Sequence, residues 1–236
     1  GIFDIKENSK SLRTQALGLS RLQLHRGPDW EGIYQSDHAI VVHERLSIVD
    51  PGNGAQPLYN DDKTQVLAAN GEIYNHVQLK SELKDPYNFK TGSDCEVLLP
   101  LYQEFKKTGE VFLDRLVGDF AFVIYDEPDD SWFLGRDHMG IVPMYIGSDK
   151  EGRFYVASEM KALTPVCDTV KEFPPGHSLY SKQDLEFHRY YKRDWMEYDN
   201  VKNNKSNISE LKEALMDSVK RQLMCDVPYG VLLSGG

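Results

Sequence analysis

Apolar residues recur at helical spacing near the start of the chain, within an otherwise polar segment. The stripe consists of Leu12, Ala16, Leu19 and Leu22. It predicts an amphipathic helix over about 11–23, which ends before the Gly27-Pro28 stop signal. From there to about residue 73, short β-branched runs alternate with turn-rich stretches, a pattern typical of antiparallel sheet.

The middle of the chain predicts two more helices and a second sheet. The helices are expected over 76–84 and 94–107, and a Ser93-x-x-Glu96 capping box opens the second one. The dipeptide Asn70-Gly71, which readily adopts positive φ, predicts a tight turn. Strands of the second sheet are expected at 119–125 and 132–137, and further strands at 144–146, 153–157 and 177–180.

A charged, Asn-rich stretch sets off the last part of the chain. We predict one domain over 1–193, a linker over 194–206 and the truncated start of a second domain over 207–236. That start consists of a helix capped by Asn207, then a buried strand and a Gly-rich turn. Because the chain begins at Gly1 with strand-like sequence and ends inside this turn, we expect it to be part of a longer protein.

The composition restricts the classes of function. The 236 residues are 40% hydrophobic and 27% charged, enough for one ordinary core or two small ones. A formal net charge of −10 disfavours binding to nucleic acid or to an anionic membrane surface. No apolar run approaches the roughly 20 residues that a membrane helix needs. Three widely spaced cysteines favour a reducing, cytoplasmic compartment, and neither they nor the histidines have metal-ligand spacing.

Two charged residues are candidates for binding a substrate. Arg45 follows a buried strand, where a guanidinium either grips a carboxylate of the substrate or forms a structural salt bridge to Glu44, Asp50 or another acid. Asp94 stands at a helix start, where it either binds a substrate ammonium or caps the helix. The residues alone leave both pairs of alternatives open.

Two glycine-containing segments are candidates for binding anionic groups. Asn70 and Gly71 could aim a side-chain amide and a backbone N–H at one point, as an oxyanion hole requires, or form a plain hairpin turn. The segment Leu232-Leu233-Ser234-Gly235-Gly236 is either a phosphate cradle of backbone amides or an ordinary turn. Cys95 lies among apolar helix residues without a nearby His, which favours a buried, unreactive thiol.

Nine motifs occur in an order that resembles class II glutamine amidotransferases. They are His25-Arg26-Gly27-Pro28-Asp29, Glu44-Arg45-Leu46-Ser47-Ile48-Val49-Asp50, Gln56-Pro57-Leu58, Asn70-Gly71-Glu72-Ile73-Tyr74-Asn75, Thr91-Gly92-Ser93-Asp94-Cys95-Glu96, Gly118-Asp119-Phe120-Ala121-Phe122, Leu134-Gly135-Arg136-Asp137, Ser158-Glu159-Met160-Lys161-Ala162-Leu163 and Pro174-Pro175-Gly176-His177. Over about 1–190 the chain resembles the glutaminase domain of glutamine-hydrolysing asparagine synthetases. Residues 230–236 resemble the start of that family's ATP-pyrophosphatase loop.

The resemblance implies an α+β fold, a four-layer α/β/β/α N-terminal-nucleophile (Ntn) hydrolase sandwich of two antiparallel sheets. The first helix and strand of an α/β ATP-pyrophosphatase domain would follow it. The implied activity is hydrolysis of glutamine to glutamate and ammonia, and the ammonia is used in the ATP-dependent amidation of aspartate to asparagine. The implied partners are therefore glutamine, aspartate and ATP with Mg²⁺, and a homodimer is left open.

The resemblance also implies a role for each site residue. Arg45 would bind the α-carboxylate of glutamine and Asp94 its α-ammonium, while Asn70 and Gly71 would form the oxyanion hole. Leu46, Glu72 and the backbone around Ile48 and Val49 would hold the substrate. Leu233, Ser234, Gly235 and Gly236 would begin the ATP site.

The nucleophile of this family is an N-terminal Cys, and the α-amine of that same Cys serves as the general base. The family pattern places that Cys just ahead of the Gly1-Ile2-Phe3 segment, and no Cys stands there in this sequence. We therefore expect the chain as written to bind glutamine weakly at most and not to turn it over. Two other readings stay open: a glutamine-binding or scaffold module without a nucleophile, and a relative that forms a β-lactam.

Overall fold

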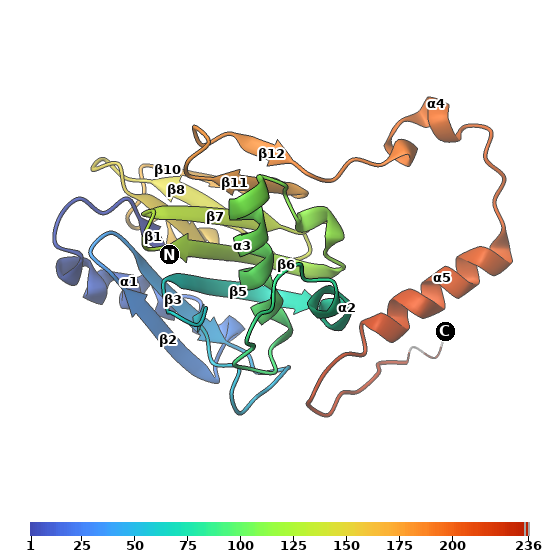
Figure 1. Cartoon of the computed structure of the whole chain (residues 1–236), viewed down its shortest axis with the longest axis horizontal. Helices are drawn as coiled ribbons and strands as arrows, with labels where there is room; N and C mark the ends of the chain where they lie inside the picture. The colour runs from blue at the N-terminus through green and yellow to red at the C-terminus, as the bar shows by residue number, and fades with distance from the viewer. Residues whose placement is uncertain (234, 236) are drawn as a thin grey trace.

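Two six-stranded antiparallel sheets form the body of the computed structural model, which describes residues 1–233 and 235 (Figure 1). In spatial order, sheet A consists of β10 (Thr169–Glu172), β8 (Tyr145–Ser148), β9 (Phe154–Ala157), β1 (Ile2–Phe3), β3 (Ile40–Arg45) and β2 (Trp30–Gln35). Sheet B consists of β12 (Phe187–Arg189), β11 (His177–Tyr180), β7 (Ser131–Arg136), β6 (Gly118–Asp126), β5 (Gln65–Ile73) and β4 (Leu58–Tyr59). The expected strands of the second half of the chain are thereby confirmed.

The two sheets pack face to face because successive side chains on each strand point to opposite sides. On β6, Val123 points into an apolar cluster between the sheets, which also contains Phe3 and Val41 of sheet A. Its neighbours Phe122 and Ile124 belong to a different cluster, on the outer side of sheet B. Both faces of β6 are therefore buried, which explains the continuous apolar run in its sequence.

Helices cover the outer face of each sheet. These helices are α1 (Arg13–Arg21), α2 (His76–Ser81) and α3 (Leu98–Thr108), whereas α4 (Tyr198–Val201) and α5 (Ile208–Arg221) belong to the last part of the chain. Short 3-10 turns are η1 (Ser9–Leu12), η2 (Leu24–Arg26), η3 (Asp94–Val97), η4 (Leu113–Arg115), η5 (Met160–Ala162) and η6 (Asp194–Met196). Leu12 and Ala16 pack on sheet A against Ile40. The helices α2 and α3 pack on sheet B, so the predicted four-layer sandwich is confirmed.

The start of the second predicted helix differs from its prediction. Residues 94–97 form the 3-10 turn η3, and the α-helical part begins only at Leu98. The side chain of Ser93 makes no cap hydrogen bond. The Glu96 carboxylate instead accepts hydrogen bonds from the backbone N–H groups of Lys90 and Thr91, at 2.7 and 2.8 Å. The predicted capping box is therefore wrong, because the Glu96 side chain is hydrogen-bonded to the backbone of the preceding loop.

The predicted tight turn at Asn70-Gly71 is also wrong. Both residues lie inside β5, where Asn70 pairs with Ala121 and Gly71 with Phe120 of β6. The glycine is needed for another reason: its φ is +123°, and a Cβ at this position would lie 1.9 Å from the carbonyl oxygen of Asp119. The pattern correctly indicated positive φ, but the chain continues as a strand because β6 pairs with it along its full length.

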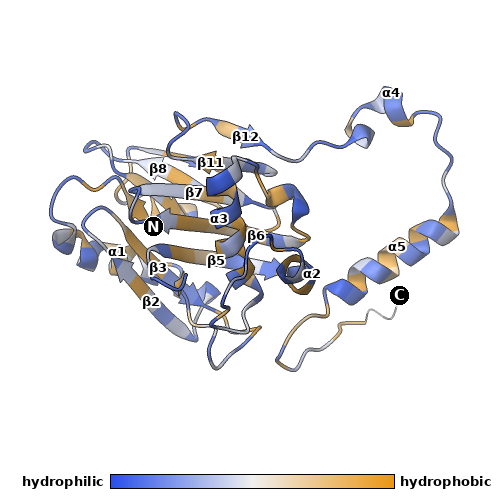
Figure 2. Ribbon diagram, viewed as in Figure 1, coloured by the Kyte–Doolittle hydropathy of each residue, from blue (hydrophilic) through white to orange (hydrophobic). Residues whose placement is uncertain are grey.

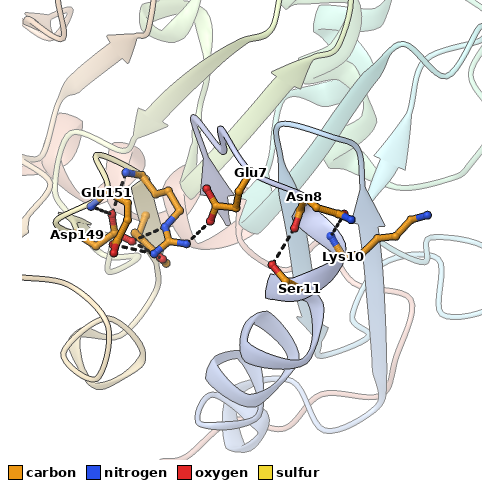
Figure 3. Close-up of polar contacts among 8 residues, drawn as sticks. Glu7, Asn8, Lys10, Ser11, Asp149 and Glu151 are labelled. Carbon is orange, nitrogen blue, oxygen red and sulfur yellow. Dashed lines mark hydrogen bonds and ion pairs between the residues drawn. The ribbon is translucent and has the colours of Figure 1, made fainter.

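Polar contacts fix the chain where it leaves β1 (Figure 3). The Asn8 side chain accepts a hydrogen bond from the Lys10 backbone N–H at 3.0 Å, which caps η1. Beside it, Glu7, Asp149 and Glu151 form ion pairs with the guanidinium of Arg153, which is only 13% exposed. These contacts hold the segment after β1 against the turn between β8 and β9. At the other end of β1, the Gly1 amino group donates to the Val156 carbonyl at 2.7 Å, and the Gly1 carbonyl accepts from the Val156 N–H at 3.0 Å.

The last part of the chain extends away from the sandwich (Figure 1). The predicted cap of α5 is confirmed, since the Asn207 side chain accepts hydrogen bonds from the N–H groups of Ser209 and Glu210. Apolar residues of α5, among them Leu211, Leu215 and Val219, are exposed. Figure 2 shows apolar positions along this helix. The strand predicted at 229–233 is not formed, because no strand of the described residues pairs with it. The proposed domain boundaries stay a prediction.

None of the helices in the part of the chain described here is long and apolar enough to cross a membrane.

We predict that Gly71→Ala lowers the free energy of unfolding by at least about 3 kcal/mol, because the new Cβ meets the Asp119 carbonyl and the backbone is strained at positive φ. The matched control is Gly18→Ala within α1, where a Cβ meets nothing within 4 Å. This control should gain about 0.5–1 kcal/mol from helix propensity. Urea unfolding of both variants measures the difference, and equal midpoints would contradict the close packing at Gly71.

Candidate active site

A cavity of about 590 Å³ opens between the two sheets at the ends of β3 and β5. All eight residues predicted to bind glutamine line it: Arg45, Leu46, Ile48, Val49, Asn70, Gly71, Glu72 and Asp94. They come from β3, the loop that follows it, β5 and the start of η3. The sandwich therefore brings together segments that are separated by up to fifty residues in the sequence.

Arg45 supplies positive charge to the cavity at the end of β3. Its guanidinium is buried and donates hydrogen bonds to the carbonyl oxygens of Val49, Asp50 and Pro51, at 3.2, 2.7 and 3.3 Å. Among the described residues no carboxylate lies within ion-pair distance, so the alternative of a structural salt bridge is wrong. The three bonds leave two of the five guanidinium N–H groups for a ligand.

Glu72 and Asp94 supply negative charge to the same cavity. Asp94 is buried and accepts a hydrogen bond from the Ile73 N–H at 2.6 Å, but burial raises its pKa. The pKa of Glu72 is raised to about 6, first by burial and then by the charges of Asp94 and Asp119. Because the charge of Asp94 raises the pKa of Glu72, the two carboxylates repel each other, and an ammonium group bound beside them would reduce this repulsion.

Asn70 and Gly71 lie on β5, between Arg45 and Glu72 in the sequence. Within the part of the chain described, the Asn70 side-chain amide has no hydrogen-bond partner and is available to a ligand. The neighbouring Ala69 is held by Gln56, whose side chain accepts from the Ala69 N–H at 2.7 Å and donates to its carbonyl at 3.0 Å. The Gln56 amide thus fixes β5 directly beside Asn70.

His43 and Gln56 also line the cavity, although neither was predicted from the sequence to take part in the site. Strand alternation places His43 on the same side of β3 as Val41 and Arg45, which could have indicated it. Burial, followed by the charge of Arg45, lowers the pKa of His43 to about 4, so the ring is neutral at pH 7. Gln56 is recognisable only in three dimensions, because its partner Ala69 lies thirteen residues away.

Cys95 also lines the cavity, beside the carbonyl oxygen of Gly71. Burial, together with the charge of Asp94, raises the pKa of this thiol well above its ordinary value. A protonated thiol is a poor nucleophile. The prediction of a buried Cys95 is therefore confirmed.

The wall of the cavity near Gly1 has the form of a gap between two strands. β1 pairs with both β3 and β9, with Ile2 opposite Ile40 and Tyr155. The residues of β3 and of the β9 edge that lie beyond this pairing line the cavity: Val42, His43, Ala157 and Ser158. A strand that continued β1 backward past Gly1 would run between these two edges.

The predicted nucleotide residues lie elsewhere. Leu233 is almost fully exposed and Gly235 does not line the cavity. Ser234 and Gly236 lie outside the described residues. In residues 1–233 and 235 no group of three or more His, Cys, Asp or Glu side chains is placed to hold a metal ion.

The sequence matches a family model described as a glutamine amidotransferase domain over residues 1–220, and residues 210–236 match an asparagine synthase model. Over the whole chain it is 62% identical to asparagine synthetase B [glutamine-hydrolyzing] of Escherichia coli. It is 47% identical to a probable glutamine-hydrolyzing asparagine synthetase of Dictyostelium discoideum. The chain spans 42% of the length of each of these relatives.

Solved structures give the same fold. A glutamine phosphoribosylpyrophosphate amidotransferase from B. subtilis aligns with 81% of this chain and 49% of its own, at a TM-score of 0.61 and 24% identity. An allosteric regulatory enzyme of purine biosynthesis aligns with 67% of this chain and 36% of its own, at a TM-score of 0.53 and 28% identity. The chain belongs to the glutamine amidotransferase domain family, and its fold is the Ntn-hydrolase sandwich.

We predict that the cost of ionising Glu72 makes stability depend on pH. Because its folded pKa of about 6 exceeds the ordinary 4.5, ionisation destabilises the fold. The penalty is absent below about pH 4.5 and complete above about pH 6. After allowance for solvent screening at this half-buried group, Glu72→Gln should be about 1 kcal/mol more stable than the unmodified chain at pH 7.5, and the gain should vanish at pH 4.

Urea unfolding at the two pH values measures this effect. The exposed Glu186, changed to Gln, is the matched control and should show no such dependence. A stability gain of Glu72→Gln that is the same at both pH values would contradict the raised pKa.

Proposed function

We propose that the cavity is a glutaminase site, which hydrolyses the side-chain amide of glutamine to glutamate and ammonia. One observation carries the proposal: a single cavity holds the Arg45 cation, the carboxylates of Glu72 and Asp94, and an uncommitted amide at Asn70. A free α-amino acid needs one positive and one negative group at a fixed separation. The side-chain amide of glutamine additionally needs a hydrogen-bond donor at its carbonyl oxygen.

In this proposal Arg45 binds the α-carboxylate through its two remaining N–H groups. Asp94 and Glu72 bind the α-ammonium, whose charge would relieve the repulsion that raises the pKa of Glu72. The backbone of Ile48 and Val49 forms the wall beside the carboxylate, and Leu46, which is 56% exposed, stands at the mouth. Membership of the glutamine amidotransferase family supports this choice of amino acid.

The proposed nucleophile is a Cys on a short segment ahead of Gly1. The gap between β3 and β9 supports this placement, because a continuation of β1 would enter the cavity there. The thiolate attacks the amide carbon of glutamine, and the Asn70 amide and Gly71 N–H stabilise the oxyanion. The C–N bond then breaks, ammonia leaves with a proton returned from the α-amine, and water hydrolyses the glutamyl thioester to glutamate.

We propose further that the longer protein is a glutamine-hydrolysing asparagine synthetase, in which this ammonia amidates aspartate at the expense of ATP. The similarity of the whole chain to such enzymes supports this assignment, as does the asparagine synthase match over 210–236. The domain boundaries, the ATP and Mg²⁺ requirement and the role of residues 233–236 belong to the same proposal. A cytoplasmic location is supported by three free cysteines, and a homodimer stays a prediction.

We predict that the chain, extended at its front by a few residues that begin with Cys, releases glutamate from glutamine. The same extension beginning with Ala should bind glutamine without turnover. In the Cys-extended chain, Arg45→Ala should raise KM by about 100-fold, because a charge-assisted double hydrogen bond to the substrate is lost. A coupled assay for glutamate gives the rates, and calorimetry gives binding.

Arg45→Lys is the conservative control, since it keeps the charge but not the paired N–H groups. Its KM should lie between that of the Cys-extended chain with Arg45 and that of Arg45→Ala. Turnover by the Ala-extended chain would remove the proposed nucleophile. Glutamine binding without turnover by the Cys-extended chain would favour a binding module instead.

A further inference from the structure

The segment after α5 returns to the sandwich and contacts the loop that holds Arg45 (Figure 1). The Asp226 N–H donates to the Ile48 carbonyl at 3.1 Å, and the Asp226 carboxylate accepts from the Asp50 N–H at 2.9 Å. Asp226 therefore forms hydrogen bonds with the backbone at both ends of the segment 48–50. Among the described residues from Asn207 onward, these are the hydrogen bonds that join this part of the chain to residues 1–206.

Asp50 is the centre of the contacts around the loop. Its carbonyl oxygen accepts hydrogen bonds from the Arg45 guanidinium at 2.7 Å and from the Gly54 N–H at 2.9 Å. Its carboxylate accepts from the Gly92 N–H at 2.7 Å. The backbone of Asp50 has a φ of +47°, a conformation that needs such support in a residue with a side chain.

These contacts connect Asp226 to both charged parts of the cavity. The carbonyl of Asp50 positions Arg45, and the carboxylate of Asp50 holds Gly92, two residues before Asp94. His76 lies close enough to be influenced by the charges of both Asp94 and Asp226. A shift of the segment around residue 226 therefore moves the loop on which the substrate-binding geometry depends.

We propose that Asp226 is a positioning residue for the cavity, and that through Asp50 it couples the segment after α5 to binding of the substrate. The proposal rests on the function proposed above. The helix α5 has no buried residue, so the two hydrogen bonds of Asp226 are the polar connection between the described residues from Asn207 onward and the sandwich. Binding energies of coupled sites are reciprocal, so a substrate that orders the loop also strengthens the hold on Asp226.

The test uses the Cys-extended chain and glutamine. Asp226→Ala should raise KM about fivefold with kcat within a factor of two, because the lost hydrogen bond lies at an exposed side chain. Asp226→Asn keeps an acceptor oxygen and should restore KM to within a factor of two. Asp217→Ala is the matched control, because Asp217 is an exposed acid on α5 whose ion pair is with Lys220.

A second measurement separates coupling from a merely structural effect. In the chain with Asp226 unchanged, hydrogen exchange of the Asp50 and Asp226 backbone amides should slow when glutamine binds. In Asp226→Ala the slowing at residue 50 should be reduced at least threefold. If glutamine binds but neither KM nor exchange depends on Asp226, the coupling is overturned. If the Cys-extended chain with Asp226 unchanged neither binds nor hydrolyses glutamine, the proposed function has failed instead.

Discussion

The buried guanidinium of Arg45 and the carbonyl groups of the following loop depend on each other. A buried cation must find acceptors, and Val49, Asp50 and Pro51 supply them through their backbone oxygens. The loop in turn folds around the cation, with Asp50 held at positive φ. Because no carboxylate of the described residues neutralises Arg45, its charge remains directed at the cavity. The same contact therefore stabilises the loop and prepares the site for an anionic group.

The sandwich places that cation and the opposing carboxylates on different supports. Arg45 ends a strand of sheet A, whereas Glu72 lies on β5 of sheet B and Asp94 begins the turn that packs on sheet B. The apolar layer between the sheets fixes the separation of these groups, and β5 is further held by Gln56. The Ile73 N–H of β5 holds the Asp94 carboxylate close to Glu72, and the charge of Asp94 raises the pKa of Glu72. A ligand with a positive charge beside these carboxylates would reduce their repulsion.

Much of this arrangement could be predicted from the sequence, and the exceptions share a physical cause. Helix and strand positions followed from local periodicity, and the eight cavity residues followed from motifs in a recognisable order. Asn70-Gly71 was misplaced as a turn because pairing with β6 overrides local preference. The Glu96 carboxylate accepts hydrogen bonds from the preceding loop and forms no capping box, and the predicted strand over 229–233 has no strand to pair with among the described residues. Gln56 and Asp226 act through contacts between distant segments, which a single sequence does not display. His43, in contrast, shares a side of β3 with Arg45, so strand alternation could have indicated it.

The central claim is that the cavity recognises a free α-amino acid by opposite charges on its two sides. A crystal structure of the chain with bound glutamine tests this claim most directly. The account predicts the α-carboxylate within hydrogen-bond distance of the Arg45 guanidinium, the α-ammonium beside Asp94 and Glu72, and the side-chain amide near Asn70. Glutamine bound in the reverse orientation, or outside the cavity, would contradict it.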